Sequence, residues 1–201
     1  GKTAACLKNY HSMPMNNEFT HETGLRILLK KIAETAAEFN MGMIPLASLS
    51  DKHYLKTVVA VRRSADMAYE CMKKLGYVFH CRKCGYRGAG GFPAQRCEEC
   101  ALTRNTEQET QFAGPLWLGE LHDKEFIKRM AGLNEKRKYA DREEIRKMLA
   151  LMENEIGMPP YYYNIHEMCG MGKLLSVPTM GTVMERLETA GFKAYRTHFS
   201  P

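Results

Sequence analysis

Four cysteines form the clearest chemical pattern in the sequence. Cys81 and Cys84 make one C-x-x-C pair, Cys97 and Cys100 make a second, and twelve residues lie between the pairs. Two thiolates spaced three apart fit on one tight turn, and two such turns facing each other make the closed tetrahedral site that zinc prefers. A closed site leaves no position for a substrate. We therefore expect the metal to hold the fold together rather than to catalyse a reaction.

Two other structures would give the same cysteine pattern. The pairs could form two disulfides, and iron is also held by four thiolates. The remaining three cysteines argue against disulfides, because scattered free thiols suit a reducing cytoplasm. We therefore predict structural Zn²⁺ in a cytoplasmic protein, with iron left open. The three scattered cysteines are Cys6, Cys71 and Cys169.

A second candidate site lies near the C-terminus. Arg196 and His198 fall in residues 192–199, which we expect to form a strand, so the two side chains should share one face. Such a pair suits contact with a phosphate backbone, and a solvated edge strand is the alternative. Two short basic clusters, Arg82-Lys83 and residues 136–138, are more often solvated than functional. The net charge of +6 favours an anionic partner only weakly.

No pattern in the sequence marks a catalytic or cofactor-binding residue. There is no G-x-G-x-x-G after a strand, no Walker loop and no nucleophile elbow. His21 and Glu22 begin a long helix, with Arg26 one turn later, and a carboxylate at that position stabilises a helix without any function. A structural or substrate-side hydrogen-bonding role is the alternative. His53 and Tyr54 are best interpreted as the exposed end of a strand.

The first part of the chain must position these residues with one helix and a strand pair. Residues 1–17 show no clear period. Residues 20–40 place apolar side chains at helical spacing, and residues 43–49 and 53–62 are β-rich, with a turn expected at 48–51. A helix capped by Ser64 and a strand over residues 77–80 then lead into the first cysteine.

The part after the cysteines is predicted to be helical. We expect helices from Asp123 to about residue 133, over residues 141–156, and over two shorter segments, 161–171 and 179–190. Followed by the strand at 192–199, this order is typical of a winged-helix unit. The second short helix carries acidic side chains, so we expect no DNA partner. No apolar run approaches eighteen residues and no secretory signal opens the chain, so we expect no membrane association.

Several segments together resemble the tRNA (guanine-26 N2) dimethyltransferase family, in its archaeal form. Each motif is weak alone, but in register they are specific and span nearly the whole chain. They are His21-Glu22 with LRIL at 25–28, Pro45-Leu46, His53-Tyr54, the ribbon of Cys81, Cys84, Cys97 and Cys100, GPLWLG at 114–119, PYY at 160–162 and RTHF at 196–199.

The resemblance implies an α+β architecture in three parts. Residues 1–76 would be the C-terminal part of a Rossmann-like methyltransferase domain that uses S-adenosyl-L-methionine (SAM), and residues 77–113 a zinc ribbon. Residues 114–201 would be a family-specific, winged-helix-like domain. The family's SAM-binding segments and its acidic D-P-F-G-like motif have no counterpart here, and NYH at 9–11 stands where K-Y-G is usual. The chain therefore looks like a fragment that lacks the methyl-donor pocket.

The family reaction transfers methyl groups from SAM to the exocyclic N2 of guanosine 26 in tRNA, after the base leaves its stack. The matched residues would serve architecture and tRNA binding, and we assign the latter to Arg196, His198, Arg82 and Lys83. The rival hypothesis is a stand-alone zinc-ribbon, winged-helix module that binds nucleic acid and has no enzymatic activity. A long helix followed by two strands favours the enzyme, because a small module does not need them.

Overall fold

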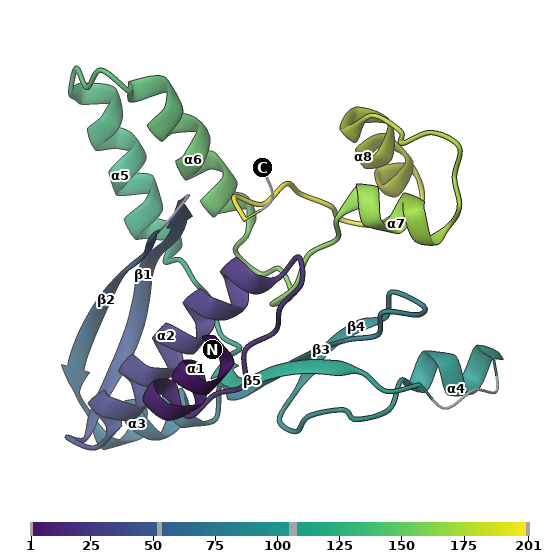
Figure 1. Cartoon of the computed structure of the whole chain (residues 1–201). Coiled ribbons are helices and arrows are strands. Elements are labelled where there is room, and N and C mark those ends of the chain that lie inside the picture. The colour runs from purple at the N-terminus through teal and green to yellow at the C-terminus, as the bar shows by residue number, and fades with distance from the viewer. Residues whose placement is uncertain (1, 52–53, 105–107, 200–201) are drawn as a thin grey trace.

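The computed structural model describes residues 2–51, 54–104 and 108–199. Helices and two small antiparallel sheets alternate along these residues (Figure 1). The elements are α1 (Lys2–Tyr10), α2 (Thr20–Ala37), β1 (Met41–Asp51), β2 (Tyr54–Arg63), α3 (Ala65–Met72), β3 (Leu75–His80), β4 (Arg87–Gly90), α4 (Glu98–Arg104), β5 (Gln111–Trp117), α5 (Lys124–Lys136), α6 (Arg142–Asn154), α7 (Ile165–Met171) and α8 (Met180–Thr189).

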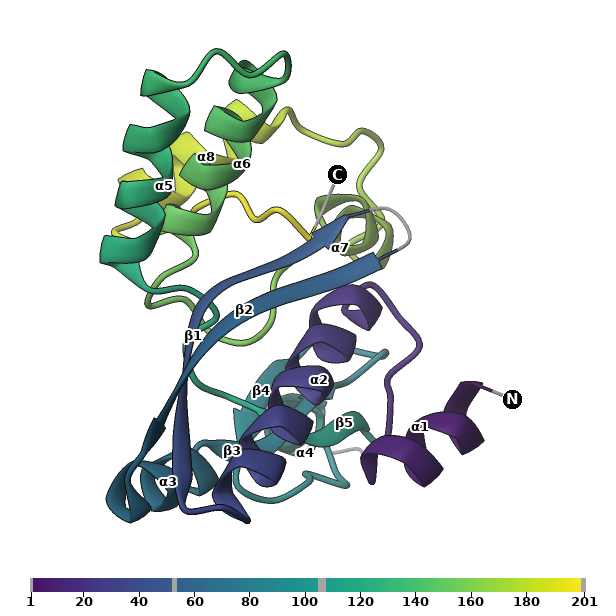
Figure 2. The same cartoon turned by 90° about the vertical axis from the view of Figure 1, so that its left-hand side faces the viewer.

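The N-terminal part is a long hairpin, β1–β2, with α2 packed beside it (Figure 2). The predicted apolar face of α2 is confirmed, because Leu25, Leu29 and Ala33 are buried in one core cluster with Met43 of β1. The register of the hairpin shifts between Pro45 and Ala47. Proline has no backbone N–H to donate to the ladder, and such an irregularity is where a strand tolerates it.

Two predictions for this part are wrong. Residues 48–51 do not form a turn, because β1 continues to Asp51, which pairs with Tyr54. His53 lies outside the described residues. The N-terminal segment is not irregular, since residues 2–10 form α1. That helix fully buries none of its residues, although Cys6 and Tyr10 pack against the core cluster beside it.

The second sheet carries the cysteine ribbon. Its strand order is β4-β3-β5, with β3 antiparallel to both neighbours. Val78, Ala113 and Leu116 of this sheet pack with Phe19 and Ile27 beside or on α2. One helix therefore joins both sheets, and β5 runs across the predicted boundary at residues 113/114.

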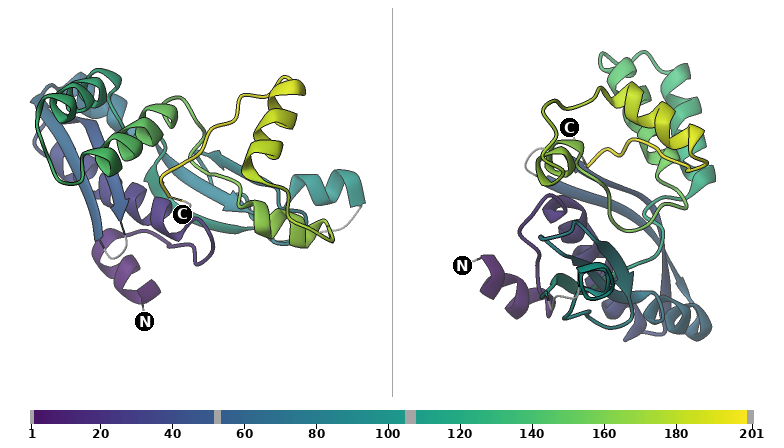
Figure 3. Two further views of the ribbon diagram at one scale, coloured as in Figure 1. Left: turned by 90° about the horizontal axis from the view of Figure 1, so that it is seen from above. Right: turned by 90° about the vertical axis from the view of Figure 1, so that its right-hand side faces the viewer.

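The C-terminal part consists of two helix pairs. The pair α5–α6 packs on β1, and α7–α8 lies on the other side of the C-terminal segment (Figures 1 and 3). The predicted caps Ser64 and Asp123 are confirmed, because each side chain accepts a hydrogen bond from the backbone N–H three residues on. Asp141 precedes α6 but makes no such bond.

The predicted strand over residues 192–199 is wrong. The described residues after β5 contain no strand, so α7–α8 has no wing. The reason is a contact with a residue distant in the sequence: the Glu155 carboxylate accepts the backbone N–H of His198 at 2.6 Å, and a side chain therefore holds the donor that a β ladder would use. The winged-helix interpretation is therefore not supported. The broader prediction of a fold that mixes helices and strands agrees with the structure.

Candidate functional site

The four predicted ligands converge at one end of the β4-β3-β5 sheet. The sulfur atoms of Cys81 and Cys100 lie 3.8 Å apart, those of Cys84 and Cys97 lie 3.5 Å apart, and all four lie within 4.8 Å of one another. Zinc bound tetrahedrally by sulfur at about 2.3 Å places its ligands roughly 3.8 Å apart. The arrangement therefore fits a four-thiolate metal site.

The local backbone explains how the first pair is presented. Cys81 follows β3 directly, and its carbonyl oxygen accepts the N–H of Gly85 at 2.8 Å. Gly85 has a φ of 78°, the left-handed conformation that glycine adopts at little cost. On the second pair, Cys100 donates its N–H to the sulfur of Cys97 at 3.4 Å, as α4 begins.

The same geometry excludes disulfides in this structure. A disulfide requires sulfur atoms about 2.05 Å apart, and all four cysteines are free thiols. Burial would raise the pKa of Cys81, but hydrogen bonds from the backbone of Cys84 and Lys83 outweigh it and lower that pKa. Because the thiolate is the metal-binding form, this shift favours metal binding by Cys81. The donor set fits structural zinc, and iron would be held in the same way.

A buried arginine, not predicted from the sequence, attaches the ribbon to the rest of the molecule. The Arg87 guanidinium on β4 pairs with Glu18 at 2.7 Å, with both side chains almost fully buried. Its central carbon also lies 4.5 Å from the centre of the Tyr163 ring, just before α7. The contact joins β4, the residues before α2 and the C-terminal part. No local spacing signals it, because the partners are distant in sequence.

Glu22 and Arg26 form a buried ion pair rather than an exposed helix start. Arg26 Nε donates to Glu22 at 2.8 Å, with each side chain about 5% exposed. One terminal nitrogen of Arg26 donates to the carbonyl oxygens of Trp117 and Gly119, each at 3.0 Å. Burial raises the pKa of Glu22, while Arg26 opposes that shift. The pair ties α2 to the end of β5, which is a structural hydrogen-bonding role.

His198 lies inside the protein, away from the surface predicted for it. Its side chain is 0% exposed and donates from Nδ1 to Glu155 at 2.8 Å. With the strand absent, nothing places it on one face with Arg196, whose side chain is exposed. Burial is the physical reason for leaving His198 out of a surface site. Arg82 and Lys83 are exposed on the ribbon, and Arg82 donates to Gln111 at 2.9 Å.

A cavity of about 520 Å³ lies between α7–α8, the end of α6 and the C-terminal segment. Apolar and aromatic side chains form most of its wall, and its charged groups include Glu22, Arg26 and Glu155. Phe192 and Tyr195 at the cavity are 64% and 51% exposed. A smaller cavity of about 370 Å³ separates α7 from the ribbon and includes Lys83. The α7 helix thus stands between two openings that carry basic residues.

The fold and the cysteine site together define an α+β protein in which a helix joins an antiparallel hairpin to a four-cysteine ribbon. The sequence profile of the family described as N2,N2-dimethylguanosine tRNA methyltransferase matches residues 1–201. The chain belongs to this family.

Individual relatives agree with that assignment. The chain is 35% identical to the tRNA (guanine(26)-N(2))-dimethyltransferase of Methanobrevibacter smithii and 38% identical to that of Methanothermobacter thermautotrophicus. Each alignment covers 98% of this chain and 50% of the relative. Among solved structures, the complex of Trm1 from Pyrococcus horikoshii with S-adenosyl-L-methionine is similar, with a TM-score of 0.82 and 29% identity over 99% of this chain and 50% of that one. The chain therefore spans about half the length of these relatives.

Proposed function

We propose that this chain is part of a cytoplasmic tRNA methyltransferase that transfers methyl groups from SAM to the exocyclic N2 of guanosine 26. The support is the family match over residues 1–201 and the names of its relatives. In this proposal residues 1–76 complete the methyltransferase domain, residues 77–113 form the metal ribbon, and residues 114–201 form the family-specific domain. The stand-alone binding module is not favoured, because the match runs through all three parts.

The described residues do not fit a SAM-binding pocket. Every strand pairing in them is antiparallel, whereas a Rossmann-like pocket is built on parallel strands with a crossover helix and a glycine-rich turn. We therefore place the SAM pocket and the proton acceptor for the guanine amine outside these residues, and we derive no chemical step for them. What remains to this chain is architecture and tRNA binding. No described helix is long and apolar enough to cross a membrane.

The single observation that carries the tRNA-binding proposal is the segment 192–196 beside the larger cavity. Basic Lys193 and Arg196 alternate with aromatic Phe192 and Tyr195, and all four side chains are exposed. Basic groups that follow a backbone, next to aromatic rings on which bases stack, are how proteins bind unpaired nucleotides. Arg196 is the strongest candidate, because its guanidinium stays charged and can donate two hydrogen bonds to one phosphate. We propose Arg82 and Lys83 as a second contact across α7.

A salt titration tests this surface. We expect the chain to bind tRNA weakly, with an affinity that falls as salt rises. Arg196→Ala should remove about one phosphate contact and reduce the slope of log affinity against log salt by a little under one. Arg62→Ala is the matched control, because it removes the same charge from an exposed position on β2. If affinity and slope are unchanged in folded Arg196→Ala, the tRNA surface lies elsewhere.

A further inference from the structure

Three residues distant in sequence form a buried polar cluster away from the cysteines. His122 lies between β5 and α5, Glu155 follows α6, and His198 lies in the C-terminal segment. His122 Nε2 is 3.0 Å from one carboxylate oxygen of Glu155, and His198 Nδ1 is 2.8 Å from the other. The hydroxyl of Thr197 and the backbone N–H of His198 also donate to Glu155, at 2.8 and 2.6 Å. All the donors point at one carboxylate.

The two ring nitrogens that do not contact Glu155, His122 Nδ1 and His198 Nε2, lie beside the edge of β1 that does not pair with β2. Along that edge, alternate residues of β1 direct their backbone N–H and C=O groups away from β2. On that edge Leu46 accepts the N–H of Asp123 at 3.0 Å. Ser48 donates its N–H to His122 Nδ1 at 3.4 Å, and Ser50 donates to His198 Nε2 at 3.3 Å. The two imidazoles therefore take the place of a third strand over this stretch.

These contacts determine which nitrogen of each ring carries the proton. A nitrogen that accepts a backbone N–H must have a free lone pair, and the other nitrogen of a neutral imidazole then donates. His122 must be protonated on Nε2 and His198 on Nδ1, which are opposite tautomers. Both N–H groups then point at Glu155, which serves them as an ionised acceptor.

The same reasoning decides against a metal ion, although a His–Glu–His set can bind one. A metal between these side chains would need the lone pairs of His122 Nε2 and His198 Nδ1. Each ring would then turn an N–H toward a backbone N–H, of Ser48 or Ser50, and both backbone donors would lose their acceptors. Histidines that bind metal normally direct the second nitrogen at an acceptor, not a donor.

We propose that His122, Glu155 and His198 form a metal-free hydrogen-bond clasp. The clasp holds the C-terminal segment on the edge of the β1–β2 sheet through His198, which lies two residues after Arg196. On the neighbouring helix α2, Glu22 interacts electrostatically with Glu155 and His198 and is paired with Arg26. This inference does not depend on the proposed function, because it concerns only how the two parts of the chain are joined.

Nuclear magnetic resonance of the folded 201-residue chain tests the clasp directly. The nitrogen chemical shifts of the two rings should report opposite neutral tautomers, Nε2–H for His122 and Nδ1–H for His198. Zinc added beyond the one equivalent that the cysteines take should leave these signals in place. Identical tautomers, or a second stoichiometric zinc that shifts both rings, would overturn the proposal.

Two substitutions then separate the edge contacts from the carboxylate contacts. In His122→Gln and His198→Asn the side-chain amide can still donate to Glu155, but the ring nitrogen that accepts the N–H of β1 is gone. We expect hydrogen exchange about tenfold faster at the Ser48 amide in the first variant and at the Ser50 amide in the second, as for the loss of one hydrogen bond. In Glu155→Gln we expect faster hydrogen exchange at both the Ser48 and the Ser50 amide. Glu153→Gln is the control, because Glu153 is exposed. Unchanged exchange at Ser48 and Ser50 in folded variants would refute the clasp.

Discussion

Each of the four ribbon cysteines is a separate test of the metal site at the scale of single residues. Structural zinc contributes about 10–16 kcal/mol of apparent binding free energy in small sites near neutral pH, so we expect one tightly held zinc per chain. Cys97→Ser should lose that zinc and loosen residues 81–100, measured by metal analysis and by proteolysis. Cys6→Ser, outside the cluster, is the control. Well under one equivalent of metal in the wild-type chain, with its thiols intact, would contradict the site.

Glu155 should make the stability of the fold depend on pH. Burial alone would raise the pKa of its carboxyl, but hydrogen bonds from His122 and His198 outweigh burial and lower the pKa from 4.5 to about 2. A lowered pKa stabilises the fold fully above the ordinary value, and this stability is lost as the pH falls from about 4.5 toward 2. The shift corresponds to about 3 kcal/mol.

Denaturant unfolding at several pH values measures this effect. Between pH 6 and pH 3 the wild-type chain should lose more free energy of unfolding than Glu155→Gln, because the variant has no carboxyl to titrate at that position. Glu153→Gln should behave like the wild-type chain, since Glu153 is exposed. The same pH dependence in all three proteins would show that Glu155 titrates normally.

At the scale of elements, the ion pair between Glu22 and Arg26 is the joint between α2 and β5. Arg26→Met leaves Glu22 buried without its partner and two carbonyl oxygens without their donor. We expect a loss of about 3–5 kcal/mol in the free energy of unfolding, with partial recovery in the double variant Glu22→Leu, Arg26→Met.

An exposed pair of the same type provides the comparison. Glu70 on α3 and Lys73, the residue that follows α3, are 2.9 Å apart with both side chains more than half exposed, so Lys73→Met should cost less than about 1 kcal/mol. Equal losses in Lys73→Met and Arg26→Met would mean that Arg26 does not join the two elements.

The elements also show where sequence reasoning succeeds and where it stops. The cysteine site could be predicted because its ligands lie in two pairs whose spacing matches one metal ion, and α2 because its buried face repeats at helical spacing. The clasp could not be predicted, since its members are 33 and 43 residues apart and no local pattern links them. The segment 192–199 was misassigned for the same reason, because a distant carboxylate holds its backbone.

At the scale of the whole molecule, the two sheets determine what this chain can do alone. Because its strand pairings are antiparallel, we expect residues 1–201 to bind no SAM and to methylate no tRNA, while a full-length relative does both. Isothermal titration calorimetry checks the first point with SAM, and transfer of a labelled methyl group checks the second. Saturable SAM binding by the 201-residue chain would contradict the proposal that the SAM pocket lies outside these residues.

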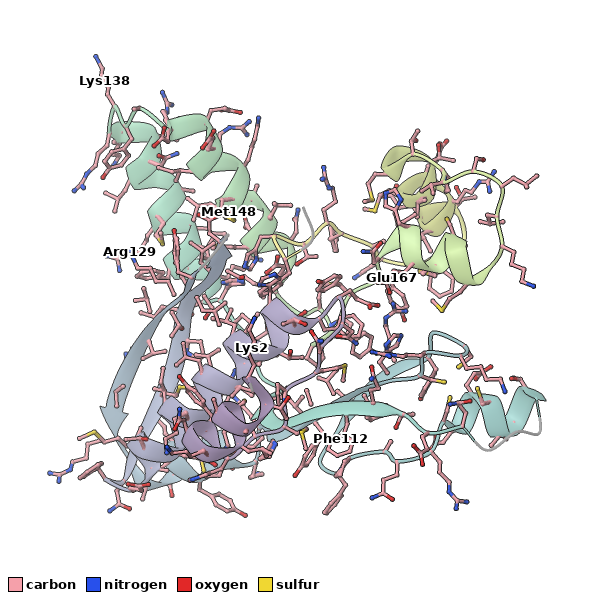
Figure 4. All side chains as sticks on the ribbon, in the orientation of Figure 1. Lys2, Phe112, Arg129, Lys138, Met148 and Glu167 are labelled. Carbon is pink, nitrogen blue, oxygen red and sulfur yellow. The ribbon has the colours of Figure 1, made fainter. Side chains whose placement is uncertain are left out.

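The surface basic groups are also distributed over the whole molecule. Figure 4 shows Lys138 at the far tip of the α5–α6 pair, remote from the ribbon and from α7. A tRNA that contacts Arg196 and the ribbon need not reach this tip. The Lys136–Lys138 cluster is therefore the next surface to test if substitution of Arg196 has no effect.

The chain contains a single tryptophan, and its position gives it an optical use. Trp117 is 1% exposed and packs with Leu25 of α2, Met43 of β1 and Phe199 of the C-terminal segment, while its indole N–H donates to the backbone carbonyl oxygen of Glu120 at 2.9 Å. Its fluorescence therefore comes from a place where the hairpin, the ribbon sheet and the C-terminal segment meet. Detachment of the C-terminal segment would expose the indole to water and shift its emission to longer wavelength, so light alone can report whether the parts of this molecule are joined.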